Sequence, residues 1–299
     1  MLFTASDRKI PISDLMITDD LSMYHQIITF LIPTRIYEGN GAIEFDSHKI
    51  KVKVLNQMLV EGGRFKTSCV SEAIYKTFNS VCEGYNGFTT INSLFSKLGF
   101  DYKSDFKSNN TYFSVPRCKV VTLLNMLTKY ASFANGGGAH FYIDSEGIVN
   151  GYDYKLIKEK SKVIDLKGEL VSESINTEWC NFSAGEYELL YWGNDNKYKK
   201  EDLKLEKGYG KMSVPICDTT GVWKNALKQE LTNEFYNRYL SSRQIFATIF
   251  DASEQIKLGQ LVNLNQWNEL MIIKALVMTY DEVSKQGRFS ATLISNPTY

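Results

Sequence analysis

Apolar and polar residues alternate most clearly over residues 49–54, where isoleucine and two valines alternate with three lysines. A period of two is typical of a half-buried β-strand. Two strand-like runs precede it: residues 23–32, which Pro33 ends, and residues 42–45, which follow a Gly-Asn-Gly turn signal. Three consecutive strands at this spacing predict an antiparallel meander or a barrel, and we expect the first ten residues or so to form an arm.

After residue 66 the apolar spacing changes to that of amphipathic helices. Residues 67–81 predict a short helix, and residues 89–100 predict a second one with a threonine N-cap and a glycine stop. An extended run at residues 111–116 separates this helix from a third, predicted over residues 120–133. The middle of the chain is therefore predicted to be mixed α and β.

The stretch AHFYIDSEGIVNGYDYKLI, residues 139–157, follows Asn-Gly-Gly-Gly at residues 135–138, which we interpret as a flexible break. The stretch predicts a β-hairpin that turns between Asp144 and Gly147, because aspartate bonds to its own backbone in a turn and glycine supplies a positive φ. Asp144 and Glu146 are also spaced for the general acid–base chemistry of glycosidases. We interpret them as turn residues.

Strand-like runs return after residue 155, together with one long helix at residues 222–239, whose apolar residues recur at four-residue steps. Residues 194–211 are charged and contain glycines, which predicts a solvated loop, and we interpret Lys197 to Lys211 as surface and not as a nucleic-acid patch. The predicted strands of this half cover residues 163–171, 174–182, 187–192, 243–250, 260–264, 270–280 and 287–294.

Composition narrows the class of protein. The chain has 299 residues, an aromatic share of 13% and equal numbers of basic and acidic residues, 34 each. Aromatic residues favour strands. A net charge of zero argues against attraction to nucleic acid or to an anionic membrane, and it permits close self-association. We find no signal peptide and no run apolar enough to span a membrane.

The five cysteines do not form a recognisable site. They lie at positions 69, 82, 118, 180 and 217, and no pair has Cys-x-x-Cys spacing. We interpret them as reduced thiols of a protein that folds in a cytoplasm. Cys180 and Cys217 have no histidine nearby in sequence, and no Gly-x-Ser-x-Gly motif occurs, so no catalytic nucleophile is predicted.

Metal and phosphate sites are not predicted either. His25, His48 and His140 are far apart in the sequence and match no zinc signature, so we interpret them as surface or packing residues. The glycines at 136–138 follow a helix and precede a strand, which reverses the order of a phosphate-binding loop.

The remaining candidates are acidic and aromatic. Asp165 and Glu173 belong to no recognisable pattern. Four aromatic residues are of the kind that stacks on sugars, although we expect them to pack in the core: Tyr191, Trp192, Trp223 and Trp267. The sequence therefore assigns no catalytic, cofactor-binding or metal-binding residue, and we predict that the protein is not an enzyme.

The order of elements resembles that of the baseplate hub proteins of tailed bacteriophages. This family includes the late-control hub proteins and is related to the N-terminal part of type VI secretion spike proteins. The resemblance begins near Met23 and rests on two short patterns. One is the hairpin FYIDSEGIV within residues 139–150, and the other spans residues 256–294 with KLGQLVNL, LMIIKALVMTYDEV and GRFSATLIS.

The resemblance implies a β-rich α+β fold with two similar antiparallel β-barrel domains of the tail-tube type and a mixed α/β insertion between them. We therefore expect a first barrel with the N-terminal arm at residues 1–66, which later strands help to complete. The insertion is expected at residues 67–155. The second barrel is expected at residues 156–299, with a long helix at residues 222–240.

The resemblance also implies a structural function without a cofactor. Such hubs are homotrimers whose six barrels adapt a sixfold tail tube to a threefold central spike. The implied partners are further copies of the chain, the tail tube protein, the central spike or needle protein, other baseplate proteins and the tape-measure protein. No membrane and no specific nucleic-acid sequence is implied, and the location is the tail baseplate of a virion assembled in the host cytoplasm.

Two alternatives stay open at this point. A tail-associated glycan-cleaving enzyme requires Asp144 or Glu146 in a cleft beside a second carboxylate. A receptor- or carbohydrate-binding β module requires Trp192, Trp223 or Trp267 to be exposed in a shallow groove.

Overall fold

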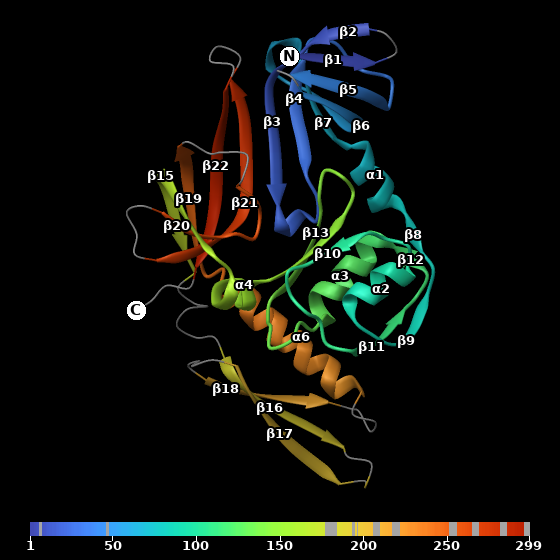
Figure 1. Cartoon of the computed structure of the whole chain (residues 1–299), viewed down its shortest axis with the longest axis vertical. Helices are drawn as coiled ribbons and strands as arrows, with labels where there is room; N and C mark the ends of the chain where they lie inside the picture. The colour runs from blue at the N-terminus through green and yellow to red at the C-terminus, as the bar shows by residue number, and fades with distance from the viewer. Residues whose placement is uncertain are drawn as a thin grey trace.

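The computed structural model describes residues 1–5, 8–45, 48–176, 184–192, 195, 197–205, 210–216, 222–250, 256–264, 269–281 and 286–295. The protein is a β-rich α+β chain built around one twelve-stranded sheet (Figure 1). A mixed α/β segment lies beside this sheet, and a separate three-stranded sheet lies below it in Figure 1.

Five strands of the N-terminal half form what we call the first strand set. Their order in the sheet is β5-β6-β7-β4-β3, and every neighbouring pair is antiparallel. The alternation that predicts a strand at residues 49–54 is confirmed, since that run lies inside the long strand β6. The set comprises β3 (Ser13–Asp20), β4 (Ile27–Ile32), β5 (Asn40–Phe45), β6 (His48–Leu59) and β7 (Phe65–Ser71), with short 3₁₀ turns at Leu21–Met23 and Glu61–Gly63.

The predicted N-terminal arm is wrong. The first residues form two strands, β1 (Leu2–Ala5) and β2 (Arg8–Pro11), and β1 pairs with both β2 and β5. Phe3 is fully buried, with its ring 5.5 Å from that of Phe30. Each strand has only four residues, which is too short for the alternation to be recognised in the sequence.

Five strands of the C-terminal half form the second strand set. Neighbouring pairs close a ring in the order β21-β20-β15-β19-β22, because β22 also pairs with β21. This is the predicted barrel, with one difference: β15 and β20 are parallel, whereas the sequence predicts an antiparallel barrel. The set comprises β15 (Val163–Ile175), β19 (Arg243–Phe250), β20 (Leu261–Leu264), β21 (Leu270–Asp281) and β22 (Gln286–Ser295).

The two strand sets repeat one topology in the same chain order. In each, the first strand pairs with the second, the second with the fifth, the fifth with the fourth and the fourth with the third. Irregularities in register recur at equivalent pairs, β3–β4 with β15–β19 and β6–β7 with β21–β22. The prediction of two similar strand-built units is confirmed at this level.

The two sets differ in how they close. In the second set the third strand, β20, pairs with the first, β15. Among the described residues no such pairing joins β5 to β3; β5 instead pairs with β1, and β2 leads directly into β3. The first set still surrounds a core of its own, which includes Phe3, Phe30 and Ile43.

The two sets meet edge to edge through β3 and β21. Met16–Asp20 pair antiparallel with Ala275–Thr279, so that Thr18 lies opposite Val277. We call this pairing the in-chain joint. Ile17 and Leu276, on the two strands of the joint, are both buried.

A mixed α/β insertion separates the two sets, as predicted. Its helix at residues 67–81 begins only at Glu72, because β7 continues to Ser71, whose side chain then caps the helix. The elements are α1 (Glu72–Asn79), β8 (Val81–Cys82), β9 (Tyr85–Thr89), α2 (Ile91–Lys97), β10 (Tyr102–Lys103), β11 (Thr111–Val115), β12 (Cys118–Lys119), α3 (Val120–Tyr130), β13 (Ala139–Ile143), β14 (Val149–Asp153) and α4 (Tyr154–Lys160).

A second insertion lies between β15 and β19. It contains β16 (Ala184–Trp192), β17 (Tyr198–Lys204), β18 (Gly210–Ile216) and the predicted long helix α6 (Val222–Tyr239). The solvated loop predicted at residues 194–211 is wrong, since that segment contains β17 and the start of β18. The predicted turn before residue 174 is also wrong, because β15 runs through to Ile175; residues 177–182 of the predicted strand lie outside the described part of the chain.

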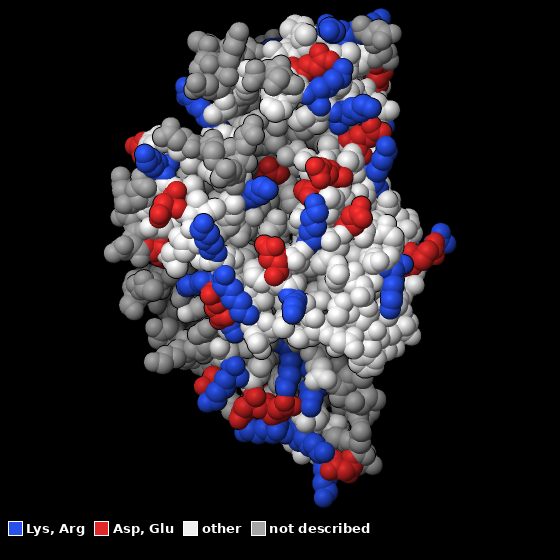
Figure 2. Space-filling view, in the orientation of Figure 1, with Lys and Arg blue, Asp and Glu red and all other residues white. Residues whose placement is uncertain are grey.

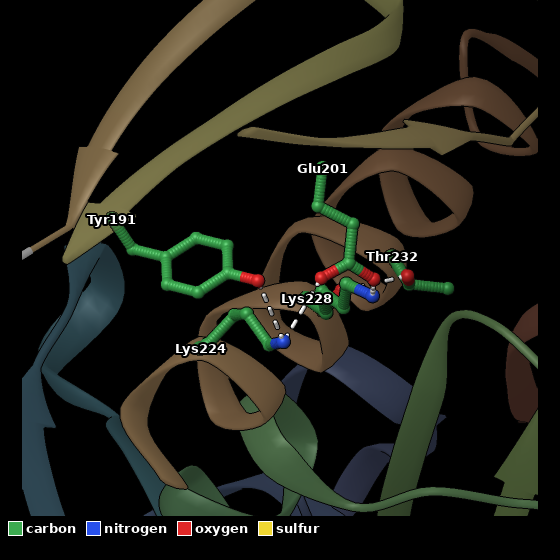
Figure 3. A network of polar contacts seen from close by, with 5 residues as sticks. All are labelled: Tyr191, Glu201, Lys224, Lys228 and Thr232. Atoms are coloured by element: carbon green, nitrogen blue, oxygen red, sulfur yellow. Dashed lines mark hydrogen bonds and ion pairs between the residues drawn. The ribbon is translucent and has the colours of Figure 1, made fainter. Parts of the chain in front are cut away.

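A polar network fastens this small sheet to α6 (Figure 3). The carboxylate of Glu201, on β17, forms ion pairs with Lys224 at 3.0 Å and with Lys228. The Lys224 Nζ also lies 4.6 Å from the centre of the Tyr191 ring. Thr232 Oγ1 donates to the Lys228 carbonyl oxygen at 2.7 Å.

The glycine run before β13 is tightly packed, so the predicted flexible break is wrong. A Cβ at Gly136 would overlap the Asp153 side chain, and one at Gly137 would overlap the ring of Tyr236. Asp153 Oδ1 accepts hydrogen bonds from the N–H groups of Gly137 and Leu156, both at 3.0 Å, and burial raises the pKa of Asp153 to about 6. Glycine is required here by close approach of neighbouring side chains.

Candidate assembly surface

Asp144 lies in the turn between β13 and β14, as the sequence predicts. Its Oδ1 accepts from the backbone N–H groups of Glu146 and Ile148, both at 3.0 Å, and its Oδ2 accepts from Asn150 Nδ2 at 2.9 Å. Gly147 has a φ of 84°. The hairpin itself therefore occupies both carboxylate oxygens of Asp144, and Glu146 is exposed.

A hollow of about 480 Å³ lies beside this turn, and a second carboxylate, that of Asp19 on β3, also lines it. Tyr142 Oη donates to Asp19 Oδ1, and Gln26 Nε2 donates to both Asp19 oxygens at 3.2 Å. Burial raises the pKa of Asp19, and the charge of Asp144 contributes in the same direction. The oxygens of both carboxylates already accept hydrogen bonds from the protein, so the arrangement holds β3 to the insertion.

The sequence gives no signal for Asp19. Its hydrogen-bonding partner Tyr142 is 123 positions away along the chain, and no local motif surrounds either residue. The two other carboxylates that the sequence leaves unassigned have ordinary partners: Asp165 accepts from Asn263 Nδ2 at 3.2 Å, and Glu173 forms an ion pair with Arg243.

The three histidines lie apart, next to aromatic rings. His25 lies 4.8 Å from Phe78 and His140 lies 4.4 Å from Tyr154, measured between ring centres. Burial lowers the pKa of His140 to about 4. His48 contacts Phe45. Among the residues that the structure describes, no group of histidine, cysteine and acidic side chains is placed to hold a metal ion.

The core packing predicted for the four aromatic candidates is wrong for Trp192, which is exposed. The Trp192 side chain, at the end of β16, is 51% exposed, and its ring centre lies 6.0 Å from that of Tyr198 in an edge-to-face arrangement. Tyr191 points to the other side, toward Lys224 of α6 (Figure 3). The Trp223 side chain and all of Trp267 lie outside the described part of the chain.

Cys69, Cys82 and Cys118 are free thiols, in agreement with the prediction for these three. Cys180 and Cys217 lie outside the described residues. In the described part of the chain, no helix has the length and apolar character needed to cross a bilayer.

The free edge of β6 exposes apolar side chains. Residues 48–53 of β6 pair with β5, but beyond them no strand in the described part of the chain pairs with that edge. We call residues 55–59 the β6 edge. Leu55, Met58 and Leu59 are all exposed there, Leu59 to 64%. Proteins normally protect such edges with charge, proline or a covering element, so an apolar edge indicates a partner.

The free edge of β15 is similar. Residues 163–166 pair with β20, and residues 167–175 pair with β19 on one side only, as far as the described residues show. We call residues 167–175 the β15 edge. Leu170, Val171 and Ile175 are exposed there, Val171 to 66%. These two edges are the features of the molecule that are best suited to assembly.

Charge on the visible face of the molecule is mixed. In Figure 2, Lys and Arg side chains are interspersed with Asp and Glu side chains from one end of the molecule to the other. On β16 and β17 the opposite charges face one another directly, as with Lys204 and Glu186 at 3.4 Å and Lys200 with Glu188. On this face no large area of one sign is visible that would attract a polyanion from a distance.

Sequence comparison finds no relative: no family model matches the chain, and no curated protein matches it. Structure comparison does find solved structures with a similar fold. A tail protein from Neisseria meningitidis MC58 has a TM-score of 0.64 and 12% identity, over 98% of this chain and 95% of that chain. The 43 kDa tail protein of prophage MuSo2 from Shewanella oneidensis also has a TM-score of 0.64, with 11% identity over 99% and 98% of the two chains.

A third solved structure agrees with these two. The prophage tail protein gp18 from Listeria monocytogenes EGD-e has a TM-score of 0.61 and 10% identity, over 100% of this chain and 95% of that chain. Identities this low establish the fold and nothing finer. The chain therefore has the fold of phage tail proteins, which confirms the resemblance seen in the order of its elements.

Proposed function

We propose that the chain is a structural hub protein of a phage tail baseplate or of a related injection machine. In this proposal three copies form a trimer, and their six strand sets make a ring that adapts a sixfold tail tube to a threefold central spike. The division into a first barrel at 1–66, an insertion at 67–155 and a second barrel at 156–299 is part of the same proposal.

The repeat within the chain is the observation that carries this function. Two sets with the same pairings, in the same chain order, with register irregularities at equivalent pairs, give each chain two copies of one unit. Three such chains provide six similar units under threefold symmetry, which is what a junction between sixfold and threefold parts requires. Closed rings are the usual outcome of head-to-tail contacts that return to their start.

The proposed partners are those of a tail junction: the tail tube protein, the central spike or needle protein, other baseplate proteins and the tape-measure protein. The proposed location is the virion tail, assembled in the host cytoplasm. The tail-protein fold of the three structural relatives supports this placement. We propose no catalytic role, because the carboxylates of Asp19 and Asp144 are engaged within the fold.

Light scattering coupled to size-exclusion chromatography tests the proposal. Three chains of 34.2 kDa give a particle of about 103 kDa. A hexamer would favour a tail tube protein instead, and a monomer that binds neither tube nor spike components would contradict the proposal.

One observation favours a second candidate function. The exposed pair of Trp192 and Tyr198 offers an aromatic surface of the kind that stacks on sugars. A glycan array probed with the wild-type chain and with Trp192→Ala tests this function. Binding that Trp192→Ala abolishes would favour a receptor-binding module, and the absence of binding to any glycan would remove this candidate.

A further inference from the structure

The in-chain joint shows how one strand set docks on another. It joins β3, the first strand of its set, to β21, the fourth strand of the other set. The equivalent strands on the free sides of the two sets are β15, a first strand, and β6, a fourth strand. Both have an edge that no strand in the described part of the chain covers, and both expose apolar residues along it.

We propose that the β15 edge of one chain pairs antiparallel with the β6 edge of the next, as a repeat of the in-chain joint between chains. This inference rests on the proposed trimer and names the surface that forms it. Each chain has one edge of each kind, so the contact is head-to-tail and runs on from chain to chain until the ring closes.

The register follows from the bulges. Lys274 is the unpaired residue of β21 against β22, and Leu55 is the unpaired residue of β6 against β7. Val277 follows Lys274 by three positions, and Met58 follows Leu55 by three. Val277 therefore corresponds to Met58.

The other strand is aligned in the same way. After the bulge in β3 the pairing resumes at Met16, and after the bulge in β15 it resumes at Ser172. Thr18 therefore corresponds to Ser174. Because Thr18 lies opposite Val277 and Asp19 lies opposite Leu276, Ser174 is expected opposite Met58 and Ile175 opposite Gln57.

Exposure of the β6 edge supports contact at this register. Met58 and Leu59 are largely exposed in the single chain, and in this register they lie opposite Ser174 and Glu173, within the five pairs that correspond to the in-chain joint. Val171 lies just beyond those pairs. Backbone pairing would cover Met58 and Leu59 while satisfying the unpaired N–H and C=O groups of both strands. A second copy of the chain fits this surface, because each edge finds its complement on the other edge of the same molecule.

Disulfide trapping in the full-length chain tests the register. Antiparallel pairs alternate between narrow and wide spacing, so two double variants are required: Ser174→Cys with Met58→Cys, and Ile175→Cys with Gln57→Cys. Within one chain β6 and β15 are six strand spacings apart in the sheet order, about 29 Å along the sheet, so we expect a disulfide between the two edges to join two chains.

Matched controls distinguish disulfides that form because of the proposed register from disulfides that form by chance oxidation. The single variants report the background from the native thiols. Ser174→Cys with Lys51→Cys places the second thiol about 23 Å along β6 from Met58, at an exposed position that is already paired with β5. This out-of-register pair should give no cross-link above the background of the single variants.

The expected result is a ladder of linked dimers and trimers on a non-reducing gel from at least one in-register pair, lost on reduction. A protein that has trimer mass in light scattering but yields no linked species from either pair overturns the inferred pairing and leaves the proposed trimer intact. A protein that is monomeric at every concentration and yields no linked species overturns both.

Discussion

Tyr142 of the insertion donates a hydrogen bond to Asp19 of the first strand set, across 123 positions of sequence. Removing this hydroxyl leaves a half-buried carboxylate with one donor fewer. We expect Tyr142→Phe to lower the free energy of unfolding by about 2 kcal/mol, measured by urea denaturation. Tyr112 donates to Asn86 on the surface, and Tyr112→Phe is expected to cost less than about 0.5 kcal/mol. Equal effects in the two variants would show that the Tyr142 contact has no special role.

Asp19 also predicts a dependence on pH. Burial raises its pKa in the folded state, so the folded protein binds the proton more tightly than the unfolded chain does. The stabilisation from this proton is complete below the unfolded carboxyl pKa, roughly 3.9, and is lost as pH rises through the folded value. The wild-type free energy of unfolding, relative to Asp19→Asn, should therefore fall between pH 3.5 and 7. A difference that is constant or grows with pH would contradict this account.

Asn233 of α6 joins three segments of the chain. Its Oδ1 accepts from the N–H groups of Gly138 and Ala139 at 3.2 and 3.4 Å, and its Nδ2 donates to the carbonyl oxygens of Lys129 and Ala131 at 2.9 and 3.0 Å. All of these groups lose a partner in Asn233→Ala, so we expect a loss of at least about 3 kcal/mol.

Calorimetry of Asn233→Ala beside Asn225→Ala measures this loss. Asn225 is exposed on the same helix, and alanine has the higher helix propensity, so the control should be neutral or slightly stabilised. A melting temperature of Asn233→Ala within a degree of wild type would show that water replaces the lost contacts without cost.

The exposed apolar edge of β6 predicts an effect on assembly that is separate from folding. Leu59→Lys puts a charge on an edge that we expect to be covered by a second copy. The trimer dissociation constant, measured by sedimentation at several concentrations, should rise at least about tenfold. At protein concentrations below that constant, where the chain is monomeric, the melting temperature should change little. Phe88→Lys, at an equally exposed position of the insertion, should leave assembly unchanged. An equal loss in both variants would indicate a general effect of charge.

Local patterns predict many elements of this fold because one segment of sequence determines each of them. The alternation at 49–54 lies within β6, Thr90 caps α2 as expected, and α6 occupies the predicted helix. The same reasoning fails where the secondary structure of a segment depends on the strands that pair with it. The sequence predicts that residues 67–71 begin a helix, yet they form part of β7 because they pair with β4 and β6.

Local sequence patterns could not predict the contacts between distant segments, because the two partners of each contact are far apart in the sequence. Asp19 and Tyr142 each carry no signal until the fold brings them together. The charged residues of β17 predict a loop when they are considered alone. In the structure two of them pair with Glu186 and Glu188 on the neighbouring strand β16. The two strand sets repeat in the order in which their strands pair and in the positions of their bulges. The residues of the two sets show no matching sequence repeat that would have predicted this.

Electron microscopy of the assembled particle, viewed down its axis, tests the central claim most directly. The account predicts end-on class averages with six similar densities around a ring and threefold symmetry, with the insertions distinguishing alternate densities. A ring with one such density per chain, or a twofold particle with no ring, would contradict it.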